Sequence, residues 1–96
     1  MEEKEFSAEA RSLIKAAYNN YNHLTLLKPE GETLRYVAGT EILAPDEDKE
    51  AKMLKKAMEE ELLSENIMKK KTDTIVLTKK GISLAETLLE NPDKKS

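Results

Sequence analysis

Residues 62–89 read LLSENIMKKKTDTIVLTKKGISLAETLL, and this stretch decides the fold of the 96-residue chain. Residues 67–68 begin a short strand, residues 69–73 form a charged turn, and residues 74–77 form a second strand rich in β-branched side chains. Thr78 follows at a position where its side-chain oxygen can accept hydrogen bonds from the first amides of a helix. The stretch therefore predicts the end of one helix, a β-hairpin and the start of another helix.

Three helices are predicted along the chain. Ser7 is a favourable N-cap for a helix over about residues 8–21, where apolar side chains recur at helical spacing. A second helix is predicted over residues 47–64, with acidic residues in its first turn, where the helix dipole favours negative charge. Asn66 is placed like the left-handed residue that ends a helix. The last helix is predicted over residues 79–90, before an Asn-Pro pair that stops it.

The apolar stripes of these helices predict a shared core. With one phenylalanine and no tryptophan in the chain, that core must be mainly aliphatic. Tyr18 and Tyr21 lie on the apolar stripe of the first helix and are expected to pack inside, whereas Tyr36 is expected to be exposed. The residues expected to be buried together are Leu13, Ile14, Leu54, Met58, Leu62, Leu84 and Leu88.

Residues 24–44 leave two predictions open. The sequence Lys-Pro-Glu-Gly at 28–31 is a turn signal, because proline fixes φ and glycine accepts a positive φ. It favours a β-hairpin between residues 24–27 and 33–37. The alternative is a short helix capped by Thr33, which would contain a glycine at a cost of about 1 kcal/mol relative to alanine.

The order of helix, hairpin and helix resembles the second half of a winged-helix domain. The phrase LTKKGISLAETLL at residues 77–89 resembles the strand-to-helix junction of small prokaryotic winged-helix regulators. The resemblance implies an α+β, winged-helix-like fold with three main helices and a C-terminal β-hairpin wing. It implies a single domain over residues 1–96, with loose tails at 1–6 and 92–96. It also favours the short helix within residues 24–44, as the first arm of a helix-turn-helix.

The same resemblance implies a small regulatory protein of transcription that binds duplex DNA. The helix at 47–64 would be the recognition helix, and the hairpin tip at 69–73 would be a wing beside the duplex. Lysine contacts phosphate well as a flexible point charge. We also expect a homodimer, because dimers match paired half-sites on DNA. The candidate DNA-binding residues are Lys49, Lys52, Lys56, Lys69, Lys70 and Lys71.

The charge distribution supports a second reading. Residues 69–80 carry a net charge of +4, whereas residues 41–65 carry −5 and the whole chain −3. Glu47, Asp48 and Glu50 would stand at the start of the recognition helix, where they would repel phosphate. The alternative function is therefore a winged-helix-like protein–protein interaction module that does not bind DNA. The lysines of the hairpin would then only protect its edge from aggregation.

Several classes of site are not predicted. The chain has no cysteine, which excludes disulfides and thiolate metal sites, and its one histidine has no ligands at metal-binding spacing. Because no catalytic motif is present, we predict no enzyme activity and no cofactor. No apolar run approaches the roughly 18 residues of a membrane span, and the acidic N-terminus is unlike a signal peptide. These features predict a cytoplasmic protein.

Overall fold

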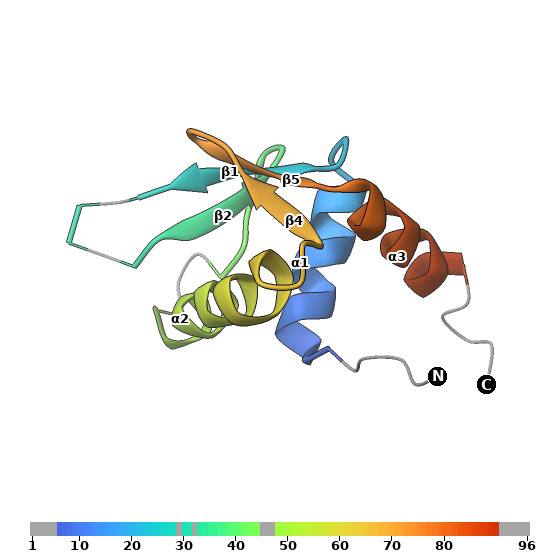
Figure 1. The fold of residues 1–96 in the computed structure, drawn as a ribbon. Helices are drawn as coiled ribbons and strands as arrows, with labels where there is room; N and C mark the ends of the chain where they lie inside the picture. Colours follow the sequence, from blue (N-terminus) through green and yellow to red (C-terminus); the bar gives the residue numbers. More distant parts are fainter. Residues whose placement is uncertain (1–5, 29, 32, 45–47, 91–96) are drawn as a thin grey trace.

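In the part of the chain that the structure describes, five antiparallel strands form a sheet, and the helices cover one face of it (Figure 1). This computed structural model describes residues 6–28, 30–31, 33–44 and 48–90. The strand order is β3-β2-β1-β5-β4. The elements are α1 (Ala8–Tyr18), β1 (His23–Leu27), β2 (Arg35–Ala38), β3 (Glu41–Ile42), α2 (Asp48–Ala57), the π-helix η1 (Met58–Leu63), β4 (Met68–Lys70), β5 (Thr74–Leu77) and α3 (Lys79–Glu90).

The hairpin alternative for residues 24–44 is confirmed, and the short-helix alternative is wrong. β1 pairs with β2 in antiparallel register, with Leu26 opposite Tyr36. Gly31 has a φ of 75° in the connecting turn, and Gly39 has a φ of 68° in the turn from β2 to β3. A helix cannot use a positive φ, so the local turn chemistry outweighed the helical spacing of the apolar residues.

The predicted C-terminal hairpin is confirmed. β4 pairs with β5, placing Met68 opposite Leu77 and Lys70 opposite Ile75. β5 also pairs with β1, so the hairpin extends the N-terminal sheet. The α+β class with three helices therefore holds among the described residues. The helix expected before the recognition helix is replaced by strands, and the winged-helix topology stays a prediction.

The helix ends follow the sequence signals, with one exception. Ser7 caps α1, because its Oγ accepts a hydrogen bond from the amide of Ala10. Asn66 has a φ of 63°, as predicted for the residue that ends the second helix. Helix α1, however, ends at Tyr18, earlier than the predicted residue 21. Residue 47 lies outside the described residues, and so do the predicted tails except for Phe6. Phe6 packs against the core.

The end of β5 and the start of α3 are joined through Thr78 to the segment that follows the second helix. Its backbone N–H donates to the carbonyl of Ile67 (3.0 Å), and its Oγ1 accepts from the N–H of Gly81 (3.1 Å). The hydroxyl donates to the carbonyl of Asn66, 2.6 Å away. A side chain at Gly81 would collide with the carbonyl oxygen of Ile67, so only glycine permits this close approach.

The predicted core is largely confirmed. Five of its seven residues, from α1, α2 and η1, are buried, whereas Leu84 and Leu88 of α3 are only partly buried. Helix α3 lies at the side of the helical layer (Figure 1), so its apolar stripe has fewer neighbours. The strands complete the core with Leu24, Tyr36, Met68, Ile75 and Leu77, together with Ile67 just before β4.

Two tyrosines occupy the opposite of their predicted environments. Tyr21 is 88% exposed with a φ of 56°, because α1 has ended and a turn has begun. The side-chain amide of Asn20 stabilises that turn by donating to the carbonyl of His23. Tyr36 is buried, because its position on β2 faces the helices together with Leu26. Burial raises the pKa of the Tyr36 phenol, and the charge of Glu59 raises it further.

The second helix changes its winding at Met58, where α2 continues as the π-helix η1. The Glu61 carboxylate in η1 accepts hydrogen bonds from the backbone N–H (2.9 Å) and the hydroxyl (2.7 Å) of Ser7. Met58 and Leu62 of the same segment are fully buried. The π-helix thus contributes buried side chains to the core and a carboxylate to the start of α1. A regular α-helix was predicted for this segment.

Substitution of Thr78 tests the junction. Thr78→Ala is expected to lower the free energy of unfolding by about 0.5–2 kcal/mol, because the amide of Gly81 loses its acceptor. Thr78→Ser keeps the hydroxyl and should retain most of that stability. Urea denaturation of the three proteins measures the difference. Equal losses for the alanine and serine variants would contradict the role of the hydroxyl.

Candidate functional site

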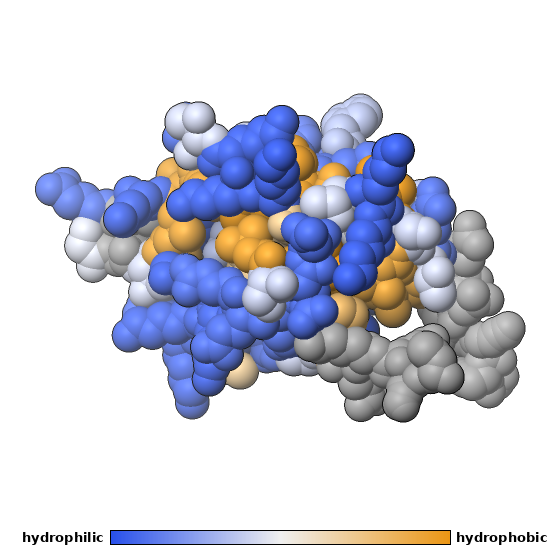
Figure 2. Space-filling model, viewed as in Figure 1, coloured by the Kyte–Doolittle hydropathy of each residue, from blue (hydrophilic) through white to orange (hydrophobic). Residues whose placement is uncertain are grey.

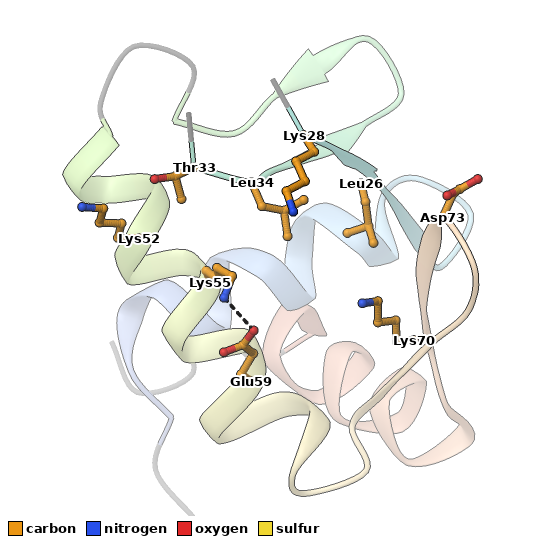
Figure 3. A pocket seen from close by; sticks show the side chains of 9 residues that line it. All are labelled: Leu26, Lys28, Thr33, Leu34, Lys52, Lys55, Glu59, Lys70 and Asp73. Carbon is orange, nitrogen blue, oxygen red and sulfur yellow. Dashed lines mark hydrogen bonds and ion pairs between the residues drawn. The ribbon is translucent and has the colours of Figure 1, made fainter. Parts of the chain in front are cut away.

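A groove of about 710 Å³ lies between the second helix and the sheet (Figure 3). Its apolar surface is formed by Leu26 of β1 and Leu34, which precedes β2. Both leucines are partly buried and pack against the core. The floor of the groove is therefore continuous with the packed core. The β1–β2 and β4–β5 hairpins form the side of the groove opposite the helix.

Four lysines from three parts of the fold line this groove. Lys28 follows β1, Lys52 and Lys55 belong to α2, and Lys70 ends β4. Figure 3 shows Lys28 and Lys70 pointing over the leucine floor from different sides, whereas Lys52 points away from it. Strand geometry explains Lys28, because side chains two residues apart share a face and Leu24 and Leu26 point toward the helices.

Two carboxylates also line the groove. Glu59 of η1 accepts from Lys55, with 2.9 Å between Nζ and Oε2, so these two charges largely offset each other. Asp73 lies in the β4–β5 turn, and its carboxylate points away from the groove in Figure 3. The interior of the groove is consequently positive, with the ammonium groups of Lys28 and Lys70 as its inward-pointing charges.

Asp48 ties the first turn of α2 to the β1–β2 hairpin at one end of the groove. Its Oδ1 lies 3.4 Å from the backbone nitrogen of Thr33 and 3.4 Å from Nη1 of Arg35. Arg35 is only 5% exposed and also donates to the carbonyl of Thr33 (2.7 Å). Hydrogen bonds from Thr33 lower the pKa of Asp48, and Lys52 and Arg35 lower it further.

All six predicted DNA-binding lysines are exposed, and they divide among several surfaces. Lys49, Lys52 and Lys56 follow helical spacing along the outer side of α2. The groove brings together only Lys52 and Lys70. Lys56 lies in a second depression beside Glu60 and Glu61.

The lysine run of the hairpin is split by the alternation of β4. Lys69 pairs with Val76 and Lys70 pairs with Ile75, which is buried against the helices. Successive side chains of a strand point to opposite faces, so Lys69 lies on the sheet face away from the groove. Lys71 follows the end of β4 and is exposed.

Lys28, Lys55 and Arg35 were not among the predicted site residues. The alternation of Leu24, Leu26 and Lys28 was the available signal for Lys28, and it required choosing the hairpin first. No sequence signal indicated that Arg35 would be buried beside Asp48, because the two residues lie in different elements.

Metal sites and membrane spans are not found in the described part of the chain. Its residues contain no group of three or more histidine, cysteine, aspartate or glutamate side chains that could hold a metal ion. Within the same residues, no helix has the length and apolar character needed to cross a membrane. The groove is therefore the candidate site of the described structure.

The lowered pKa of Asp48 gives a prediction about acid. A carboxyl group whose pKa is lower in the folded state adds stability above its unfolded pKa, and that stability is lost as the pH falls through the folded pKa. We expect NMR titration to place the pKa of Asp48 below the value of about 3.9 for an unperturbed aspartate. In Asp48→Asn this part of the pH dependence of stability should disappear. An Asp48 pKa at or above the unperturbed value would contradict the contacts with Thr33 and Arg35.

Comparisons with known proteins add no relative to this description. The chain matches no family model, no curated protein and no solved structure. The resemblance to winged-helix domains consequently depends on residues 62–89, and the function is argued from the groove and its charges.

Proposed function

We propose that this chain is a small winged-helix-like regulatory protein that binds duplex DNA. The observation that carries the proposal is the position of Lys52 and Lys70, which come from the second helix and the C-terminal hairpin and line the same groove. A helix and a hairpin that present lysines on one surface can contact phosphates on both sides of a DNA groove.

The exposed stripe of α2 extends this surface. Lys49, Lys52 and Lys56 are spaced three and four residues apart, which places them along one side of the helix. None of them is an arginine, the residue best suited to bidentate guanine contacts. The proposed interface therefore contacts mainly phosphate, and its affinity depends little on base sequence.

Asp48 in the first turn of α2 opposes DNA binding less than the sequence indicates. Asp48 is engaged by Thr33, Arg35 and Lys52, with its Oδ2 3.6 Å from the Lys52 ammonium. Glu59 is likewise engaged by Lys55. These carboxylates are held by cations of the same protein, and this reduces their repulsion of phosphate.

A protein–protein interaction module remains the second candidate function. The observation that favours it is the leucine floor of the groove, formed by Leu26 and Leu34, which phosphate contacts do not require. The expected homodimer also remains a proposal, and sedimentation equilibrium at several protein concentrations tests it. A protein–protein interaction module would not bind duplex DNA at any salt concentration.

Fluorescence anisotropy with a labelled duplex tests the DNA proposal. Binding should weaken linearly on a plot of log affinity against log salt concentration. The double variant Lys52→Gln/Lys70→Gln should bind several duplex sequences more weakly by similar factors. It should also flatten the salt slope by roughly one unit for each phosphate-binding lysine that is replaced.

Lys69→Gln is the matched control, because it removes the same charge from the neighbouring residue on the opposite face of β4. We expect this variant to keep most of the affinity and the salt slope. Absence of binding at low salt, or equal losses of affinity in Lys69→Gln and Lys70→Gln, would overturn the proposed interface.

A further inference from the structure

The groove has an apolar floor that DNA binding leaves unexplained. Leu26 and Leu34 line it, although both are joined to the core. Figure 2 shows a hydrophobic area between the strands and α2, bordered by hydrophilic side chains. Phosphate needs charge and hydrogen-bond donors, whereas the accessible part of these partly buried leucines favours an apolar occupant.

The charges around this floor determine which charge a bound ligand can carry. Lys28 and Lys70 point over the leucines from different sides (Figure 3), while Lys55 is paired with Glu59. The two inward ammonium groups repel a cation. Glu59 is paired with Lys55 and therefore does not serve as their counterion. An anionic head between Lys28 and Lys70 would complement them, because a carboxylate accepts charge-assisted hydrogen bonds from lysine.

We propose that the groove binds a small amphiphilic carboxylate, with an aliphatic body on Leu26 and Leu34 and its carboxylate between Lys28 and Lys70. The volume of about 710 Å³ is within the range of roughly 300–1,000 Å³ that is usual for small-molecule sites. Seven of its nine lining residues are polar or charged, so the aliphatic body contacts only Leu26 and Leu34, while polar side chains around them can fix its orientation.

Octanoate is the probe. Two control molecules separate the contribution of its carboxylate from that of its aliphatic chain. Octan-1-ol keeps the chain without the charge, and acetate keeps the charge without the chain. Titrations followed by methyl NMR, below the concentration at which octanoate forms micelles, should show saturable shifts at Leu26 and Leu34. Octan-1-ol should bind about a hundredfold more weakly, since it lacks both charged hydrogen bonds. Acetate should produce no saturable shifts at these methyl groups.

Three variants locate the carboxylate. Lys28→Gln and Lys70→Gln should each weaken octanoate binding by about tenfold, the usual effect of one hydrogen bond to a charged group. Lys69→Gln should bind octanoate like the unaltered protein, because its side chain lies on the other face of the sheet. All three positions are exposed, so the variants should fold, and their NMR spectra verify this.

Several outcomes would overturn the proposal. One is binding of octan-1-ol as tight as that of octanoate. Another is octanoate affinity unchanged by the double variant Lys28→Gln/Lys70→Gln. A third is methyl shifts centred on Leu27 and Ile42, which are exposed elsewhere on the sheet. These titrations contain no DNA, so they can succeed where the DNA proposal fails. Competition between octanoate and duplex at Lys70 rests on the proposed function and is measured by adding octanoate to the anisotropy assay.

Discussion

The carbonyl group of Ile67 is the point at which the segment after the second helix meets the start of α3. It accepts the N–H of Thr78 and occupies the space where a side chain at position 81 would stand. The N–H of Ile67 donates to the carbonyl of Leu62, so the same residue also ends the π-helix. The end of the second helix, the C-terminal hairpin and the start of α3 are thereby fixed to one residue. Glycine at 81 is the sequence requirement of this arrangement.

The geometry of the groove depends on where that junction places β5. Once β5 is placed, it pairs with β1, and β1 pairs with β2 on its other side. Lys28 follows β1 and Lys70 ends β4, so the sheet positions both lysines. The helix is positioned independently, through Asp48 at its first turn and Glu61 at its end. The opening is therefore bounded by elements that are fixed at both ends, as a preformed binding site requires.

The parts of the fold that could be predicted are those specified by neighbouring residues. The caps at Ser7 and Thr78, and the left-handed Asn66, each depend on residues within a few positions, and so does the turn between β4 and β5. The π-helix could not be predicted, because Glu61 bonds to a residue 54 positions away. Tyr36 was misplaced for a related reason: its face of β2 is defined by pairing with Leu26, which the open choice between hairpin and helix left undetermined.

The candidate site shows why a charge count along the sequence was a poor guide to local electrostatics. Residues 41–65 have a net charge of −5, yet several of their carboxylates are directed at groups of the same molecule. Asp48 contacts Arg35, Glu59 contacts Lys55, and Glu61 contacts Ser7. Each of these contacts reduces the negative potential that an outside ligand would meet. The charge over the leucine floor depends on which side chains point inward, and the inward-pointing charged side chains are lysines. A net negative protein can in this way present a positive groove, because a ligand responds to the nearest unscreened charges and only weakly to those beyond a Debye length of about 8 Å.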